Sequence, residues 1–534
     1  VKCGMLVKAQ QVHDEVPLRN VVSWSALIAG YAQEEKGYEA LDCFEHMRNE
    51  GLSPNAITFV SILKACASIN DVEKGKQIHD EIVARGLLKE NVLLGTALVD
   101  MYAKCGALVN AQEALEELHI RDIVSWNALI SGYSQGKQSY EALNCLERMQ
   151  NEGLSPDVVT LTCALKACGN IGAVEKGLKI HEAVIDSGLL ENNVMLNTAL
   201  VDMYAKCGML AQAQKLHDQL SARSVGSWNA LLAGYVEHEQ SQEALTCFEC
   251  MKEECFSPDS VTFLCVLKAC GSTGSIEKGK EVHDKIMCSG LLDENIALGS
   301  GLVDMYAKCG CLAKAQEVHD ELNVRSVISW SSLIAGYAQQ GQGKEALLCF
   351  LQMQNEGLSP NAVTFLCILS ACSRSGRLEE AEMVFEMMSR EYDFIPNLEH
   401  YVCMIITSGS AGNFDKAVAV IRSMPSLDYC VVWLALLGAC RKWGNIKLGR
   451  LAFDQAVQVD SSCATSYILV ANMFSDAGMQ VDAERIEAMR VKHATAWKDL
   501  WDNASGDVCS ISYEDISKYF DNKDIDAKIA RYYL

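Results

Sequence analysis

The chain repeats itself every 102 residues. Residues 21–55, VVSWSALIAGYAQEEKGYEALDCFEHMRNEGLSPN, recur with variations three times, and four tryptophans fall in register at Trp24, Trp126, Trp228 and Trp330. Self-similarity at a fixed period is the signature of a stacked repeat architecture. At 534 residues the chain also exceeds what one hydrophobic core usually supports. The sequence therefore predicts an array of stacked units.

Each period contains three units, of 35, 36 and 31 residues, and each unit reads as a pair of helices. In the first unit the apolar residues Trp24, Leu27, Ile28 and Tyr31 have the i, i+3, i+4, i+7 spacing of one helix face. Gly51 signals the end of the second helix. Helices of about a dozen residues are marginal alone in water, so each pair must bury its apolar face against its neighbours. The predicted fold class is all-α.

The repeat divides most of the chain into equal segments. The N-terminal 20 residues match the end of a unit whose first helix is absent, so we expect the chain to be a fragment. The C-terminal stretch matches nothing earlier and is rich in aromatic and acidic residues. The expected segments are 1–20, a partial repeat of the third and shortest unit, called S-type below; 21–122, 123–224 and 225–326, three-unit segments; 327–428, a diverged three-unit segment; 429–494, further helix pairs; and 495–534, an unassigned acidic and aromatic tail.

Composition narrows the possible functions. Most of the 24 cysteines recur in columns, once per period, which predicts buried packing positions in a reducing compartment. The formal charge of −23 argues against a protein that grips nucleic acid mainly through phosphates. No apolar run approaches the roughly 18 residues of a membrane span, which argues against a membrane protein.

Three motifs carry a resemblance to a known family. IVSWNALISGYSQ with GLSPD, TFVSILKAC with GKQIHDEIVARG, and TALVDMYAKCG resemble the P, L and S motifs of PLS-class pentatricopeptide-repeat (PPR) proteins over residues 1–428. Residues 429–494 resemble the tetratricopeptide-like (TPR-like) E domain that follows such arrays, and the DYW deaminase domain of some members is lacking. The resemblance implies a right-handed α-solenoid of helix-turn-helix units that binds single-stranded organellar RNA, in a mitochondrion or plastid.

In this family the P-L-S order with an E domain implies a site-recognition factor for C-to-U RNA editing, which recruits a deaminase or another editing factor in trans. We expect no enzyme and no cofactor here. The deaminase signature, His-x-Glu followed by Pro-Cys-x-x-Cys, is approached by His79-Asp80-Glu81 and by Cys247 with Cys250, but both lie inside repeat helices. Two alternatives stay open: a protein-binding TPR-like scaffold with no RNA role, which the acidic charge favours, and a degenerate or truncated gene product.

The resemblance also implies which residues read bases, because the fifth residue of a motif meets the base edge and the last residue helps to fix it. The pairs are Ser25/Asn55, Thr96/Asp122, Asn127/Asp157, Thr162/Asn193, Thr198/Ser224, Asn229/Asp259, Ser300/Ser326 and Ser331/Asn361. In the other L units the fifth residue, Val60, Leu264 or Leu366, cannot hydrogen-bond a base. The family code of A for Ser/Asn, G for Thr/Asp and U for Asn/Asp gives the preferred sequence A-x-G-U-x-x-U-x-x-A. The alternative is that these polar residues cap helices and form turns.

Two further columns complete the predicted interface. An apolar residue near the start of a P motif is implied to pack between bases, at Val22, Val124 and Ile328, and Gly226 breaks this column. A lysine at the end of the first helix of each S unit is implied to contact phosphate, at Lys104, Lys206 and Lys308, although the helix dipole alone also favours a lysine there.

Base reading requires accessible side chains. We therefore expect Thr96, Asn127 and Asn229 to line an inner groove and to point away from the neighbouring helices. With few phosphate contacts, RNA binding should also depend only weakly on salt.

Overall fold

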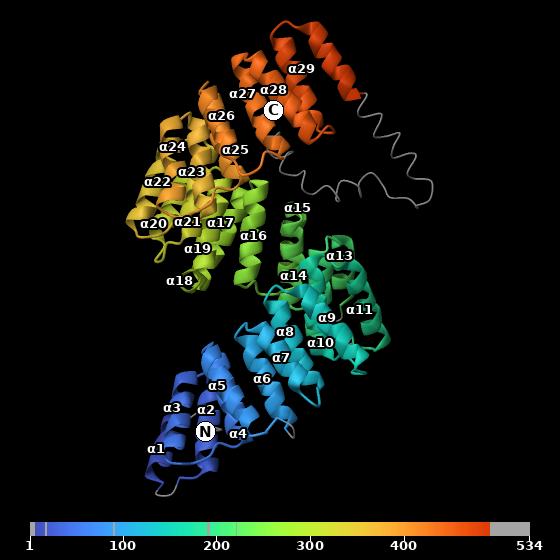
Figure 1. The fold of residues 1–534 in the computed structure, drawn as a ribbon, viewed down its shortest axis with the longest axis vertical. Helices are drawn as coiled ribbons and strands as arrows, with labels where there is room; N and C mark the ends of the chain where they lie inside the picture. The colour runs from blue at the N-terminus through green and yellow to red at the C-terminus, as the bar shows by residue number, and fades with distance from the viewer. Residues whose placement is uncertain (1–5, 17–18, 89–90, 190–192, 221, 492–534) are drawn as a thin grey trace. The chain divides into compact units, whose positions relative to one another are not determined.

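The computed structural model describes residues 6–16, 19–88, 91–189, 193–220 and 222–491, and within these ranges every regular element is a helix (Figure 1). The predicted all-α solenoid of helix pairs is confirmed. The chain divides into two compact units, Val1–Ala269 and Cys270–Leu534, with the boundary inside helix α16 (Ser260–Thr273). The tail expected at 495–534 lies outside the described residues.

The first unit is a stack of helix pairs in two layers. We call the first helix of each pair an A helix and the second a B helix. From α2 to α14 each A helix packs against the next A helix, and from α3 to α13 each B helix packs against its own A helix and the following one. The helices are α1 (Leu6–Glu15), α2 (Val21–Gln33), α3 (Gly37–Asn49), α4 (Ala56–Ser68), α5 (Val72–Ala84), α6 (Val92–Lys104), α7 (Leu108–Glu117), α8 (Ile123–Gln135), α9 (Ser139–Asn151), α10 (Val158–Ile171), α11 (Val174–Asp186), α12 (Val194–Lys206), α13 (Leu210–Gln219), α14 (Val225–Glu237) and α15 (Ser241–Glu253).

The second unit has the same plan and continues through the segment from 429 onward. Its A helices α19, α21, α23, α25, α27 and α29 pack in succession, and residues 480–491 form a further helix after α29. The helices are α17 (Ile276–Ser289), α18 (Leu291–Glu294), α19 (Ile296–Lys308), α20 (Leu312–Glu321), α21 (Val327–Gln339), α22 (Gly343–Asn355), α23 (Ala362–Ser375), α24 (Leu378–Arg390), α25 (Leu398–Ser410), α26 (Phe414–Arg422), α27 (Cys430–Trp443), α28 (Ile446–Val459) and α29 (Ala464–Asp476).

Local sequence signals set the helix ends. Helix α8 begins with a capping box, in which the Asp122 side chain accepts a hydrogen bond from the Ser125 N–H (2.8 Å) and the Ser125 hydroxyl accepts one from the Asp122 N–H (3.1 Å). Helices α3 and α6 are followed by Gly51 and Gly106, whose positive φ angles of 75° and 71° suit glycine at a helix end. Because these signals recur in each period, the helix pairs recur with them.

The core of each pair is built from the apolar columns of the repeat. Trp126 and Trp330 are fully buried, and Cys66, Cys168, Cys270 and Cys372 occupy the same buried position once per period, on the A helices α4, α10, α16 and α23. Burial raises the pKa of the Cys66 thiol to about 12, so this thiol stays protonated at neutral pH. The cysteine column therefore behaves as small apolar packing, as the sequence predicts.

Candidate nucleic-acid interface

The predicted base-reading residues come from two places on the A helices. The fifth residue of each unit lies in the second turn of an A helix, and the last residue directly precedes the next A helix. In most units the fifth residue is buried: Ser25, Thr96, Asn127, Thr162, Asn229, Ser300 and Ser331 are at most 9% exposed. Consecutive A helices are in contact from α2 to α14 and from α19 to α29, so the fifth residue of a unit lies close to the cap of the next A helix.

The last residue of each unit is the N-cap of the next A helix, so the capping alternative describes these residues correctly. Their side chains accept a hydrogen bond from a backbone N–H in the first turn, at 2.8 to 3.1 Å. The caps are Asn55, Asp122, Asp157, Asn193, Ser224, Asp259, Ser326 and Asn361. Capping leaves each carboxylate or amide with further oxygen lone pairs for a second partner.

That second partner is the fifth residue at five junctions. Asn127 Nδ2 donates to both carboxylate oxygens of Asp157 (3.0 and 3.1 Å), and Asn229 does the same with Asp259 (3.0 Å to each). Weaker contacts join the three S-type pairs, Thr96 to Asp122 (3.3 Å), Thr198 to Ser224 (3.4 Å) and Ser300 to Ser326 (2.9 Å).

The other three pairs do not meet directly in the described structure. Ser25 and Asn55 both contact Thr58, which lies between them, and Ser331 and Asn361 share Thr364 in the same way. In the remaining pair, Thr162 donates to the Val158 carbonyl (2.7 Å), while Asn193 caps helix α12.

The side chains of Thr96, Asn127 and Asn229 do not avoid the neighbouring helices as expected. Asn127 accepts a hydrogen bond from Thr160 of helix α10 (2.5 Å), Asn229 accepts one from Thr262 (2.6 Å), and Thr96 donates to the cap of helix α8. The physical reason is that an amide or hydroxyl at this depth must find a hydrogen-bond partner within the protein. Only a narrow edge of each side chain reaches the surface.

The cap carboxylates of Asp157 and Asp259 are held in their charged form. Burial alone would raise the pKa of Asp157, but the backbone N–H of Thr160 and the amide of Asn127 outweigh it, so the pKa lies below its usual value. The pKa of Asp259 is lowered for the same reasons, against the same effect of burial. A carboxylate only accepts hydrogen bonds, so each Asn must turn its NH2 toward the Asp.

An exposed apolar column lies next to the fifth residues. Val22, Val124 and Ile328, the predicted base-flanking residues, are 72%, 54% and 64% exposed, three positions before the fifth residue on the same helix face. The L and S units carry equivalent exposed residues that the sequence analysis missed. These are Ile57, Leu93, Val159, Met195, Val261 and Val363. Their recurrence at the second position of the A helix was the available signal.

The three predicted phosphate-contacting lysines are paired within their own helices. Lys104 bonds to Asp100 (2.7 Å), Lys206 to Asp202 (2.9 Å) and Lys308 to Asp304 (2.7 Å), each across one helical turn. The paired aspartate offsets much of each lysine's field. Any phosphate contact here would have to compete with that ion pair.

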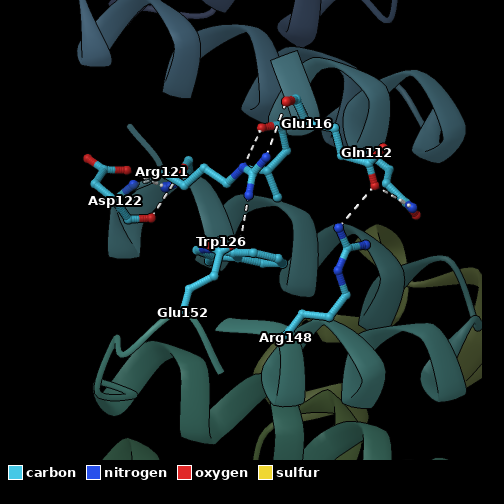
Figure 2. A network of polar contacts seen from close by, with 9 residues as sticks. Gln112, Glu116, Arg121, Asp122, Trp126, Arg148 and Glu152 are labelled. Carbon is cyan, nitrogen blue, oxygen red and sulfur yellow. Dashed lines mark hydrogen bonds and ion pairs between the residues drawn. The ribbon is translucent and has the colours of Figure 1, made fainter. Parts of the chain in front are cut away.

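A polar network holds the chain that leads into helix α8 (Figure 2). Ahead of helix α8, Arg121 forms an ion pair with Glu152 (2.5 Å) and donates to the Leu115 carbonyl (3.0 Å), while Trp126 Nε1 donates to Glu152 (3.3 Å). The same arrangement joins Arg19 and Trp24 to Glu50, and Arg325 and Trp330 to Glu356. Because Arg121 adjoins Asp122, the network fixes the position of that cap.

The residues that match parts of the deaminase signature lie inside repeat helices and pack there. The His79 ring meets the Tyr102 hydroxyl (3.1 Å), and Cys247 is buried in helix α15. Within the described ranges no group of three or more His, Cys, Asp or Glu side chains could hold a metal ion. Nor is any helix of the described chain long and apolar enough to cross a membrane.

Comparison with known families and proteins gives consistent matches. A PPR repeat family model matches residues 19–68, 121–170, 223–272 and 325–374, and a PPR repeat model matches 57–87, 198–225, 261–291 and 363–392. The chain is 35% identical to the chloroplastic pentatricopeptide repeat-containing protein At1g11290 of Arabidopsis thaliana, over 92% of this chain and 60% of that protein. It is 33% identical to At2g13600 of the same plant, over 92% of this chain and 80% of that protein.

The solved structures agree on the fold. Maize PPR10 superimposes with a TM-score of 0.55 at 17% identity, over 93% of this chain and 83% of PPR10. PPR10 in complex with an 18-nucleotide psaJ RNA element gives a TM-score of 0.52 at 16% identity, over 92% of this chain and 88% of that chain. The present chain spans about 60% of the length of the first curated relatives that it matches.

Proposed function

This chain belongs to the pentatricopeptide-repeat family, and from that premise we propose that it is a sequence-selective adaptor that binds single-stranded RNA during organelle RNA processing. The relatives named chloroplastic or mitochondrial support an organellar location. The P-L-S order of motifs, followed by E-domain-like helix pairs at 429–494, supports the finer role of recognising C-to-U editing sites, with a deaminase or another editing factor recruited in trans.

The observation that carries the proposal is the pairing of Asn127 with Asp157, repeated by Asn229 with Asp259. A carboxamide has two N–H donors and two carbonyl lone pairs. One N–H directed between the two Asp157 oxygens satisfies both contacts, and Thr160 uses one lone pair. The Asn127 amide is left with one N–H donor and one carbonyl lone pair. These match the adjacent acceptor and donor on the Watson–Crick edge of uracil.

The exposed apolar column supports the same role. Capping and core packing do not require a valine or isoleucine to stand 54–72% exposed at the second position of an A helix. Placed beside each fifth residue, such a side chain offers a surface on which a base can pack. Single-stranded RNA is recognised through splayed bases of this kind, and PPR repeats read about one base per repeat.

The acidic charge favours base contacts over phosphate contacts as the source of affinity. The net charge of −23 and the ion-paired lysines leave little attraction for the RNA backbone. The same charge is the one observation that favours the alternative, a TPR-like scaffold that binds protein rather than RNA. Binding measurements on RNA separate the two.

The test compares the RNA A-x-G-U-x-x-U-x-x-A with a scrambled RNA of equal composition, by fluorescence anisotropy. We expect the matching RNA to bind more tightly. A designed swap sharpens the test: Asn127→Ser with Asp157→Asn copies the Ser25/Asn55 pair and should move the preference at the fourth nucleotide from U to A. Equal affinity of the chain for the matching and scrambled RNAs would refute the proposal.

A further inference from the structure

A buried threonine bridges the fifth residue and the cap at every junction that follows a P unit. Thr58, Thr160, Thr262 and Thr364 are the third residues of helices α4, α10, α16 and α23, and all four are fully buried. Thr160 Oγ1 lies 2.5 Å from Asn127 Oδ1 and 2.9 Å from Asp157 Oδ1. The distances are 2.6 and 3.0 Å for Thr262 with Asn229 and Asp259. We call each such contact a hydroxyl bridge.

The junctions that follow an S unit lack this bridge. There the third residue is a serine, and its hydroxyl donates to the carbonyl of the cap itself: Ser125 to Asp122 (2.8 Å), Ser227 to Ser224 (2.9 Å) and Ser329 to Ser326 (2.9 Å). Among the hydrogen bonds of the described residues, none joins these serines to Thr96, Thr198 or Ser300. Both kinds of junction therefore share the capping box, and only the junctions after P units have a third-residue hydroxyl that also contacts the fifth residue.

The hydroxyl bridge determines how the reading amide is oriented. Thr160 Oγ1 accepts the Asp157 N–H (3.2 Å), so its own proton is available as a donor. The nearer acceptor is Asn127 Oδ1 at 2.5 Å rather than Asp157 Oδ1 at 2.9 Å, and two oxygens that close require the proton between them. Asn127 thus has its oxygen toward a hydroxyl donor and its nitrogen toward a carboxylate. Turning the amide over would set oxygen against carboxylate oxygen and NH2 against the donated proton.

The orientation of the amide matters because uracil and cytosine present reversed patterns on the edge that faces it. Uracil offers a ring N–H donor beside the O4 acceptor, whereas cytosine offers a ring nitrogen acceptor beside the N4 donor. A fixed amide matches one order, and an amide that can turn over matches both. We infer that Thr160 and Thr262 are positioning residues that set the preference of Asn127 and Asn229 for uracil over cytosine, an inference that rests on the proposed function.

The experiment measures two Kd values for the A-x-G-U-x-x-U-x-x-A RNA, one with C and one with U at its fourth nucleotide. The ratio of the Kd for C to the Kd for U reports the preference for uracil. We expect Thr160→Val to lower this ratio about 3- to 10-fold, the effect of losing one hydrogen bond. Thr160→Ser keeps the hydroxyl and should retain the ratio. Ser125→Ala is the matched control, because it removes a hydroxyl from the equivalent capping box without touching the fifth residue.

The outcomes separate the inference from the proposed function. If the wild-type chain prefers U and Thr160→Val keeps the full ratio, the inference is wrong and the proposed function stands. If Ser125→Ala lowers the ratio as much, the effect belongs to capping and the inference is again wrong. If the wild-type chain binds matching and scrambled RNA equally, the proposed function fails first. Should melting curves show that Thr160→Val is unfolded, Thr262→Val decides at the seventh nucleotide, with Ser227→Ala as its control.

Discussion

Acidification should destabilise the chain through one buried histidine, His217 on helix α13. Its ring is fully buried and packs edge-on against Trp228, with ring centroids 4.2 Å apart. Among the described residues, neither ring nitrogen has a hydrogen-bond partner. Burial, and then the positive charge of Arg223, lowers the pKa of His217 from 6.5 to about 4, although Asp218 acts in the opposite direction.

The sign follows from where the proton binds. The unfolded chain takes up a proton near pH 6.5 and the folded chain does so only near pH 4, so protonation favours the unfolded state as the pH falls between these values. The contribution of His217 to stability is therefore complete above pH 6.5 and is lost as the pH falls toward 4. One pKa unit corresponds to about 1.4 kcal/mol, so the loss amounts to about 2 kcal/mol at pH 5.

The repeat itself indicates an apolar residue that can replace His217. Leu115 occupies the position equivalent to His217 in the preceding period and is fully buried. We expect His217→Leu to be at least as stable as wild type at pH 7.5, because it removes two unpartnered ring nitrogens. At pH 5 the variant should gain about 2 kcal/mol more over wild type.

Urea unfolding followed by circular dichroism at pH 7.5 and pH 5 measures both differences. Acidic and basic groups elsewhere titrate in wild type and variant alike, so their effects cancel. The exposed His119 provides the control, since His119→Gln should leave the difference between the two pH values unchanged. A difference between His217→Leu and wild type that is the same at pH 7.5 and pH 5 would show that His217 is not held neutral by burial.

Two further predictions test the packing and the charge. Gly234→Ala should destabilise the first unit by about 1–3 kcal/mol in urea unfolding, because its new Cβ would lie 2.5 Å from the Cβ of Ala205. The control is Gly438→Ala, also within a helix, whose new Cβ would have no atom within 4 Å and should cost no stability. Equal losses of stability for the two variants would contradict the packing argument. RNA binding should weaken only slightly with salt, and Lys206→Ala should reduce the slope of log K against log salt by about 0.7 if Lys206 meets a phosphate. The control is Lys166→Ala, which removes an exposed lysine of helix α10 outside the predicted phosphate-contacting column. An unchanged slope for Lys206→Ala would leave Lys206 as a helix-end residue.

Much of this protein is determined by its sequence alone, because the signals are local. The 102-residue period, the apolar spacing around each tryptophan and the Gly51 stop act within one helix pair, so they predict the all-α stack without knowledge of neighbouring pairs. The same holds for the caps, since Asp122 and Ser125 are three residues apart. The lysine pairs with Asp100, Asp202 and Asp304 were also within reach, at four residues along a helix.

Only the tertiary structure decides how the fifth residues are held. Asn127 meets Asp157 and Thr160 across 30 and 33 residues, at a distance set by how one A helix packs on the next. The sequence has a hydroxyl residue at the third position after P and S units alike, yet Thr160 reaches the preceding A helix and Ser125 bonds to its own cap. The contact of Thr160 with Asn127 exists only when the two A helices are packed together, and periodicity along the chain does not encode that distance. The burial of His217, whose position is leucine in the period before, is decided in the same way.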